Sequence, residues 1–273
     1  MRHVLFEFAG FPIYSYWFFY GLGLLSSMSL AVWLAYRRSL DLRKVLLLSA
    51  AAVISAVVFA RLAAVFFGTR FSDMLDLQKN GQISFGGSFG ALFIIVLLAR
   101  PLKIPIADVF DGAACAIPIA QGIQRIGCFL NGCCFGPVST SFFSVRYPRG
   151  TSCFIHHLKT GLVGPSDLFS QPVFPIQLAA SLTCFFVSGI CIRLFLRKQL
   201  RGKILGLYFV LYGTLRFILQ WYRPDYDKDN TVSGWNTGHS VCMLMLLVGL
   251  IILFSNNPAK KFLLSREISS ARM

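Results

Sequence analysis

A stripe of polar side chains in an apolar segment near the C-terminus has the residue types and spacing of an anion-binding site. Tyr212, Arg216, Gln220 and Arg223 stand at positions i, i+4, i+8 and i+11, which places all four on one face of a helix. A guanidinium presents a planar fork of N–H donors that matches phosphate oxygens. The stripe therefore predicts that this helix lines a polar cavity or binds a polar headgroup, and the two arginines favour a phosphate.

A second candidate is the stretch QRIGCFLNGCCFG, from residue 124 to residue 136. It joins a cation, Arg125, to closely spaced glycines and to the amide of Asn131. Glycines permit backbone N–H groups to approach an anion closely. The alternative interpretation is the end of a helix followed by a tight turn.

Ionisable residues inside apolar segments are costly in a bilayer, so each one is a functional candidate. Arg61, Asp108, Asp111 and Arg216 are residues of this kind. For Arg216 the alternative is a pair with Asp111 that only ties two helices together.

Seven apolar segments are available to position these side chains. A helix that crosses a bilayer core of about 30 Å needs about 20 mostly apolar residues. The segments run approximately over residues 14–36, 45–68, 83–99, 106–124, 176–196, 204–222 and 237–254. They predict an all-α, polytopic membrane protein with about seven transmembrane helices, which form a single integral membrane domain over residues 1–273.

The charge of the loops predicts the orientation of these helices. The loops after the first, third, fifth and seventh segments are rich in Lys and Arg, and the others have mixed charge. Basic loops stay in the cytoplasm, so we expect the N-terminus outside and the C-terminus inside a bacterial inner membrane. The longest connection, residues 125–175, then forms a periplasmic head segment, and a loop of this length is usually functional or a small subdomain.

The composition agrees with a membrane protein and argues against a nucleic-acid partner. Hydrophobic residues make up 56% of the chain, and the mean hydropathy of +0.66 exceeds that of soluble domains. The net charge of +15 is concentrated in short loops beside apolar segments, as the positive-inside bias produces. We therefore expect the lipid bilayer as a partner and no nucleic acid.

The cysteines divide into two groups. Four lie in apolar stretches and are expected to be small core residues: Cys115, Cys184, Cys191 and Cys242. Four lie near the head segment: Cys128, Cys133, Cys134 and Cys153. For this second group close packing is the main expectation, and the alternatives are a disulfide that involves Cys153 or a metal or redox cluster that includes His156.

Three motifs together resemble the prolipoprotein diacylglyceryl transferase family: RIGCFLNGCCFG at 125–136, LYGTLRFILQWYRPD at 211–225 and FFYGLGLL at 18–25. FPIQL at 174–178 is similar to an element that follows the periplasmic head in this family. The resemblance covers most of the chain. It implies transfer of the diacylglyceryl group of phosphatidylglycerol to the lipobox cysteine thiol of a prolipoprotein signal peptide, with glycerol phosphate as the other product and with no metal or nucleotide cofactor.

The resemblance also implies roles for individual residues. Arg125 would hold the phosphate of phosphatidylglycerol, and Arg216 would be the family's second essential arginine. With Tyr20, they are the expected catalytic residues. Arg125 is also expected to bind substrate, together with residues at further motif positions: Gly127, Asn131, Gly136, Tyr212, Gln220, Arg223 and Asp111.

Three positions depart from the family's motifs. Gly86 stands where the family carries a histidine that is a candidate general base, Gln220 replaces a glutamate, and Cys128 replaces an asparagine. Because Gly86 and Gln220 do not take up a proton near neutral pH, the base must be elsewhere, or the substrate thiol must ionise through the positive field alone. The candidates are Tyr20, Asp111, His239 and the paired head histidines His156 and His157, which are expected to lie at the surface.

The alternative function is therefore a catalytically impaired paralogue that binds phospholipid or lipoprotein without transfer.

Overall fold

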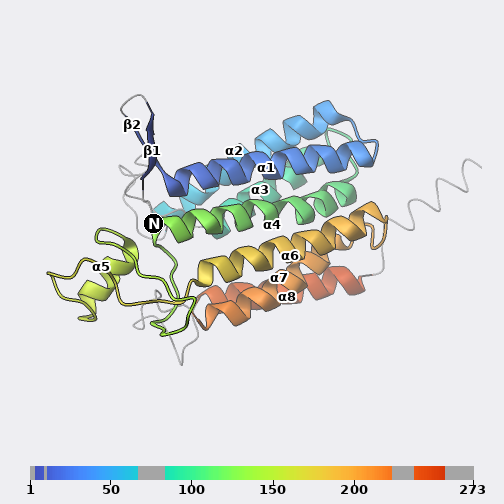
Figure 1. Cartoon of the computed structure of the whole chain (residues 1–273). Coiled ribbons are helices and arrows are strands. Elements are labelled where there is room, and N and C mark those ends of the chain that lie inside the picture. The colour runs from blue at the N-terminus through green and yellow to red at the C-terminus, as the bar shows by residue number, and fades with distance from the viewer. Residues whose placement is uncertain (1–3, 9–10, 67–83, 223–236, 256–273) are drawn as a thin grey trace, which may run out of the picture. The chain divides into compact units, whose positions relative to one another are not determined.

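The computed structural model describes residues 4–8, 11–66, 84–222 and 237–255. Helices dominate these residues (Figure 1): α1 (Ser15–Arg37), α2 (Leu42–Phe66), α3 (Ser84–Ala99), α4 (Ile106–Asn131), α5 (Ser152–Lys159), α6 (Ile176–Leu196), α7 (Ile204–Gln220) and α8 (Thr237–Phe254). All of them except the short α5 coincide with the predicted apolar segments. The all-α prediction is therefore confirmed.

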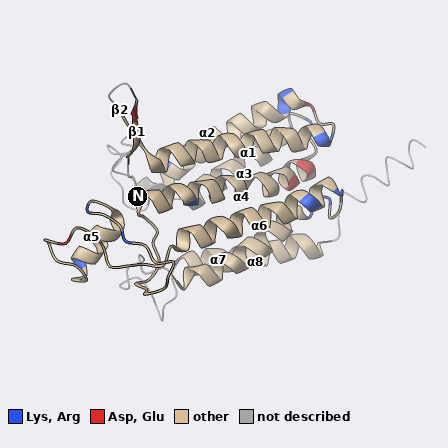
Figure 2. Ribbon diagram, viewed as in Figure 1, with Lys and Arg blue, Asp and Glu red and all other residues tan. Residues whose placement is uncertain are grey.

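The apolar helices have the length and composition of membrane spans. Four of the described helices are long and apolar enough to cross a bilayer: α1, most of α2, α4 and α6. The apolar parts of α3, α7 and α8 are shorter. Figure 2 shows that most charged residues of the described chain lie near helix ends and that the helices between them are nearly uncharged. The chain is a multi-pass membrane protein.

Two short strands precede α1, and the sequence pattern does not predict them. β1 (Val4–Phe8) pairs antiparallel with β2 (Phe11–Tyr14), and the register is irregular between Val4 and Phe6. Aromatic and β-branched residues favour extended backbone in this stretch. The hairpin leads directly into Ser15, so it adds a small β element to an otherwise helical fold.

The fold divides into two compact units. The first unit comprises residues 1–27 and 114–273, and the second comprises residues 28–113. α1 and α4 each contribute one part to either unit. A single integral membrane domain over the whole chain stays a prediction.

In the second unit, α3 approaches α2 closely because it presents glycines. A Cβ at Gly86 would lie 2.5 Å from the Ala63 Cβ and 2.7 Å from the Phe59 carbonyl oxygen. One turn later, a Cβ at Gly90 would lie 2.5 Å from the Phe59 Cβ, and the Ser55 hydroxyl donates to the Gly90 carbonyl at 2.9 Å. Small residues one turn apart are typical of helix contacts in membranes. Neither glycine position has room for a side chain.

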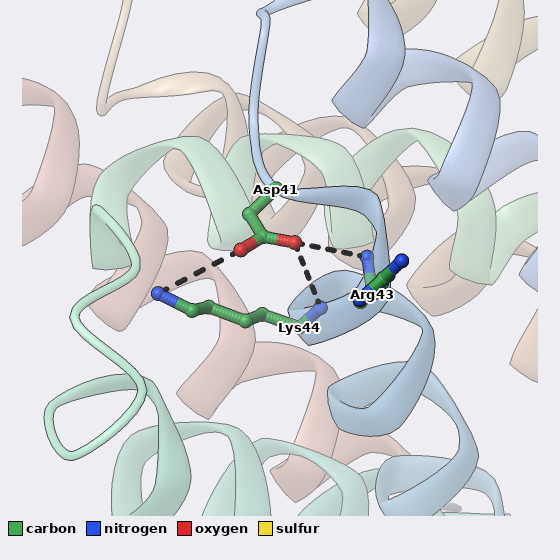
Figure 3. Close-up of polar contacts among 3 residues, drawn as sticks. All are labelled: Asp41, Arg43 and Lys44. Atoms are coloured by element: carbon green, nitrogen blue, oxygen red, sulfur yellow. Dashed lines mark hydrogen bonds and ion pairs between the residues drawn. The ribbon is translucent and has the colours of Figure 1, made fainter.

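The turn between α1 and α2 contains Asp41, whose carboxylate caps the start of α2. The Asp41 carboxylate accepts hydrogen bonds from the backbone N–H groups of Arg43 at 3.1 Å and Lys44 at 3.4 Å, and it lies 3.8 Å from the Lys44 Nζ (Figure 3). Asp41 therefore caps α2. Arg38 pairs with Asp108 at 3.2 Å, and both side chains are buried. The Asp108 carboxylate therefore has a positive counter-charge where α4 begins.

In the first unit, α6, α7 and α8 run side by side (Figure 1). Small residues and hydroxyl groups form the contacts among these helices and the later part of α4. The Ser181 hydroxyl of α6 donates to the Gly122 carbonyl of α4 at 2.8 Å. Between α7 and α8, a Cβ at Gly206 would lie 2.9 Å from the Gly249 carbonyl oxygen. The hydroxyl is satisfied by protein where water is scarce, and the glycines let α7 and α8 approach closely.

The predicted end of the fourth apolar segment at residue 124 is wrong, because α4 continues to the residue before Gly132. Gly132 has a φ of +73°. Its N–H bonds the Phe129 carbonyl at 3.4 Å, and the Cys133 N–H bonds the Cys128 carbonyl at 3.2 Å. This pair of bonds is a Schellman motif, which ends a helix at a glycine. Arg125 therefore lies inside a helix and not at the start of the head segment, and the interpretation as a helix end with a tight turn is confirmed.

The rest of the head segment is a small folded piece of the first unit, found beside α5 in Figure 1. Isolated bridges pair both Val138 and Val145 with Val173. Its buried core consists of Phe135, Tyr147, Cys153 and Val173. The head thus has a hydrophobic core of its own.

One glutamine of α6 anchors this head to the membrane helices. The Gln177 side chain is 1% exposed. Its Nε2 donates to the Cys133 carbonyl at 2.8 Å and to the Tyr147 hydroxyl at 3.1 Å. The start of α6, the loop after α4 and the head core are therefore held together at one point.

Candidate functional site

A row of polar side chains joins α4 to α7 within the first unit. The Tyr208 hydroxyl donates to the Gln121 Oε1 at 3.4 Å. One turn further along both helices, Tyr212 interacts electrostatically with Arg125. The Tyr208 and Tyr212 rings stack, with centroids 5.5 Å apart. Arg125 therefore shares the polar row with two stacked tyrosines of α7.

Cys184 of α6 connects the two arginines that the sequence selects. Its thiol interacts electrostatically with Arg125 of α4 and with Arg216 of α7. Tyr212 also interacts with both guanidiniums. These shared partners bring Arg125 and Arg216 together as one candidate site formed by α4, α6 and α7. Sequence reasoning did not select Cys184 because a cysteine in an apolar stretch carries no signal that separates it from core packing.

Arg216 also interacts with α8. It has electrostatic interactions with His239 and Cys242. The His239 side chain is 1% exposed, and its ring centroid lies 5.1 Å from that of Phe217 and 4.7 Å from that of Trp221. An imidazole is therefore buried beside the second arginine, which keeps His239 among the candidate proton acceptors.

The polar stripe of α7 faces the protein interior. Tyr212 is 9% exposed and Gln220 is 2% exposed, and Arg216 is half-buried. Arg223 lies outside the described residues. A polar face that is buried in protein within an apolar helix is what a functional site requires.

The tyrosine that the sequence selects in α1 is one turn from a tyrosine that contacts α4. Tyr20 is half-buried and stacks on Tyr16, with centroids 6.3 Å apart. The Tyr16 hydroxyl accepts a hydrogen bond from the Gln124 Nε2 at 3.0 Å. Sequence reasoning missed Tyr16, although its i, i+4 spacing to Tyr20 was an available signal.

Two glycines at motif positions lie at close packing contacts. A Cβ at Gly127 would lie 2.8 Å from the Phe19 Cβ, and a Cβ at Gly136 would overlap the Phe174 carbonyl oxygen. Gly127 therefore lets α1 approach α4 in the first unit, and Gly136 lets two parts of the head cross. Their expected contact with substrate stays a prediction.

Three thiols gather where α4 ends. The Sγ atoms of Cys128, Cys133 and Cys134 all lie within 4.8 Å of one another, and Asn131 hydrogen-bonds to Cys133. Hydrogen bonding to Cys128 lowers the pKa of the Cys133 thiol, but hydrogen bonding to Cys134 and burial raise it more, so the pKa rises to about 12. The Cys133 thiol therefore keeps its proton at neutral pH.

The remaining cysteines behave as expected. The four in apolar stretches are buried, as predicted: Cys115, Cys184, Cys191 and Cys242. Cys153 packs in the head core, and the eight cysteines, which all lie in the described residues, form no disulfide. Close packing therefore describes Cys153.

Two of the predicted ionisable candidates belong to the second unit. Asp111 of α4 is fully buried, and Arg61 of α2 is 6% exposed. The expected role of Asp111 in substrate binding, like its alternative pairing with Arg216, stays a prediction.

The prediction that the paired head histidines lie at the surface is wrong for His157. Its side chain is 2% exposed, and its ring lies 5.7 Å from that of Phe135, while His156 is half-buried at 5.5 Å from the same ring. Burial, followed by the charge of His156, lowers the pKa of His157. The apolar face of α5 places His157 in the head core, which its sequence position alone did not indicate.

We expect the head to lose stability as the pH falls below about 6.5, the value of an unperturbed histidine. Because the pKa of His157 is lowered in the folded state, the unfolded chain binds the proton more readily. Stability that is fully present above about pH 6.5 is then lost as the pH falls toward the folded-state pKa. Thermal unfolding in detergent at about pH 7.5 and about pH 5.5 measures this loss.

The matched comparison is His157→Gln against Lys159→Gln, a substitution at the exposed end of the same helix. His157→Gln should reduce the acid-dependent drop in melting temperature. Lys159→Gln should show the same drop as the wild type. Equal drops in all three proteins would contradict the role of His157.

Two guanidiniums from different helices, a shared tyrosine and a shared thiol form a candidate site for an anion inside a multi-pass membrane protein. Arginines fixed in place by a folded scaffold stabilise negative charge on a phosphate or on a leaving group. The class that fold and candidate site together indicate is a multi-pass membrane protein with two arginines among its apolar helices that suit an anionic group.

The chain belongs to the prolipoprotein diacylglyceryl transferase family, whose model matches residues 3–255. It is 25% identical over 265 residues to phosphatidylglycerol–prolipoprotein diacylglyceryl transferase 2 of Clostridium perfringens, covering 95% of this chain and 97% of the relative. It is 26% identical over 255 residues to the transferase of a Wolbachia from Drosophila simulans, covering 88% and 90%. It is 30% identical over 209 residues to the transferase of Francisella tularensis subsp. novicida, covering 74% and 69%.

Proposed function

We propose that the chain transfers the diacylglyceryl group of phosphatidylglycerol to the lipobox cysteine thiol of prolipoproteins. The observation that supports this most directly is that Arg125 and Arg216 share Tyr212 and Cys184 as electrostatic partners. Two guanidiniums in one place among apolar helices fit the phosphodiester of a lipid whose acyl chains stay in the bilayer. The relatives reported above are named for this activity.

The reaction is a displacement at the glycerol carbon that carries the phosphate ester. The acceptor sulfur attacks this carbon as a thiolate, because the thiolate is the nucleophilic form. The carbon–oxygen bond to the phosphate breaks, and glycerol phosphate leaves with the electron pair. Arg125 would hold the phosphate, and both guanidiniums would stabilise the charge that grows on it in the transition state.

The remaining site residues would position the two substrates. Tyr212 interacts electrostatically with both arginines and would orient them, and Gln220 continues the same buried face of α7. Tyr20 would relay a proton or contact the lipid from α1. The other residues proposed to bind substrate follow the family's motif positions: Asp111, Gly127, Asn131, Gly136 and Arg223.

We place the protein in the bacterial inner membrane, with the head segment on the periplasmic side and the C-terminus in the cytoplasm. α6 supports this orientation, because the head precedes it and a basic loop, residues 197–203, follows it. With 21 residues, α6 has a length of about 31 Å at 1.5 Å per residue, enough to cross the bilayer core. Basic loops remain on the cytoplasmic side. Prolipoprotein signal peptides would then meet the site from the periplasmic half of the membrane.

A transfer assay tests the proposed function. The purified full-length protein in vesicles that contain phosphatidylglycerol labelled in its acyl chains is incubated with a lipobox peptide. We expect label to move to the peptide, and a peptide whose lipobox cysteine is replaced by serine should stay unlabelled. Binding of phosphatidylglycerol without any transfer to the cysteine peptide would contradict the proposal and favour a non-catalytic paralogue.

A further inference from the structure

The thiols of Cys128, Cys133 and Cys134 form a compact cluster that the proposed function does not use. Their Sγ atoms lie within 4.8 Å of one another. The Schellman turn brings them together, because the Cys133 N–H bonds back to the Cys128 carbonyl at 3.2 Å. Cys134 then takes a left-handed backbone conformation with a φ of +54°, which non-glycine residues rarely adopt.

The size of the cluster suits one metal ion. A zinc–sulfur bond is about 2.3 Å long, so neighbouring sulfurs in a tetrahedral thiolate site lie about 3.8 Å apart. The three Sγ atoms are already within 4.8 Å, so small side-chain rotations would bring them into that geometry. The loop that carries two of the ligands is held from outside the cluster, because Gln177 donates to the Cys133 carbonyl at 2.8 Å.

The charge around the cluster also fits a metal thiolate. Three thiolates and one Zn²⁺ carry a net charge of −1, which is costly among apolar helices without a counter-charge. Arg125 precedes Cys128 by one helical turn and interacts electrostatically with both Cys128 and Cys134. Tyr16 of α1 interacts with all three cysteines. The guanidinium would therefore neutralise the complex.

We propose that Cys128, Cys133 and Cys134 bind a Zn²⁺ ion as three thiolates and that the fourth position of the ion takes the thiol of the acceptor peptide. The second half rests on the proposed function. Catalytic zinc sites commonly have three protein ligands and one exchangeable position. A thiol that coordinates zinc is deprotonated outright, and the transfer reaction needs a thiolate.

The position beside Arg125 gives this ion a use in the reaction. The guanidinium that would hold the phosphate interacts electrostatically with two thiols of the cluster, so the zinc-bound sulfur and the leaving group would be held close together. On coordination, the acceptor thiol releases its proton to water. Its sulfur then forms a bond to the glycerol carbon, the carbon–oxygen bond breaks, and glycerol phosphate takes the electron pair. Zinc keeps its oxidation state throughout. This proposal differs from the expectation that the reaction needs no metal.

Metal content tests the site without any turnover. The full-length protein, purified in detergent without chelator, should contain about one zinc per chain. Cys133→Ser and Cys134→Ser should each lower this content at least about 10-fold. Cys191→Ser is the matched control, because it replaces a buried cysteine of α6 that is not part of the cluster, and it should keep the zinc.

Three results would overturn the zinc site. They are a chain that stays free of zinc even after incubation with Zn²⁺, one copper ion per chain in its place, and a disulfide among the three cysteines in protein alkylated before reduction. If wild-type protein of this kind still performs the transfer, the proposed function stands and only the metal site falls.

Cobalt tests the fourth ligand separately. Co²⁺ in place of zinc reports each bound thiolate by a sulfur-to-cobalt charge-transfer band. Addition of the lipobox peptide should raise this band by about one third, since three thiolates become four, and the serine peptide should leave it unchanged. An unchanged band with the cysteine peptide would overturn activation of the acceptor. A raised band in a protein that performs no transfer would support the metal site and contradict the proposed function.

Discussion

Replacement of Arg125 by alanine is expected to lower the rate of diacylglyceryl transfer by at least about 100-fold, the loss typical when one charge-stabilising donor is removed from an active site. Arg125 is the guanidinium that interacts both with Tyr212 of α7 and with the thiols at the end of α4. If Arg125 holds the phosphate as proposed, the alanine variant would lack the main phosphate ligand and the counter-charge for the leaving group. The rate of label transfer from phosphatidylglycerol to a lipobox peptide measures this loss.

Two further variants separate chemistry from folding. Arg125→Lys keeps the charge but loses the planar fork of donors, so its rate should fall between those of the wild type and the alanine variant. Arg197→Ala removes an exposed arginine at the end of α6 and should keep the wild-type rate. If Arg125→Ala and Arg197→Ala both kept the wild-type transfer rate, the phosphate would be bound elsewhere.

Introduction of the family's histidine at position 86 is expected to destabilise the protein and not to raise its activity. A Cβ at Gly86 would already lie 2.5 Å from the Ala63 Cβ and 2.7 Å from the Phe59 carbonyl oxygen. An imidazole there would force α3 away from α2. Overpacking of this kind costs about 1–3 kcal/mol or more, so Gly86→His should lower the melting temperature in detergent by several degrees.

A pair of alanine variants isolates the packing effect. Gly86→Ala adds only the methyl group that the structure has no room for, and it should lower the melting temperature. Gly189→Ala in α6 adds the same group where no atom lies within 4 Å, and alanine in an open helix position stabilises by about 0.5–1 kcal/mol. The two shifts should therefore have opposite signs. A raised melting temperature or a raised transfer rate in Gly86→His would contradict the packing account.

The absent histidine illustrates how a motif difference gains a physical meaning from the structure. In the sequence, Gly86 is a residue that does not take up a proton. In the structure, Gly86 and Gly90 form a contact surface for α2. The packing of the second unit leaves no room for a side chain at that position.

The membrane fold could be predicted because its signals are local. Apolar runs of sufficient length predict spanning helices, and the described helices α1–α4 and α6–α8 coincide with the predicted segments. The boundary of α4 was misplaced, because a polar, glycine-containing run resembles a loop until the Schellman bonds at Gly132 are known. The N-terminal hairpin was missed because two strands this short carry too little pattern.

The site could be predicted in part. The face of α7 that carries Tyr212, Arg216 and Gln220 follows from helical periodicity alone, and the motifs identified Arg125. The sequence did not indicate that Cys184 interacts electrostatically with both arginines or that Tyr16 interacts in this way with the thiols at the end of α4. Such contacts join residues far apart in the chain, and their partners depend on how helices rotate and pack.

The sequence by itself determined the polar stripe of α7, because helical spacing fixes which residues share a face. Tertiary structure alone decided what that face meets: Arg125 and Cys184 in the first unit, and His239 beside Arg216. It also decided that three cysteines of an unremarkable turn become one cluster. The physical reason is that periodicity is a property of consecutive residues, whereas proximity between helices is set by the side chains that have room to pack between them.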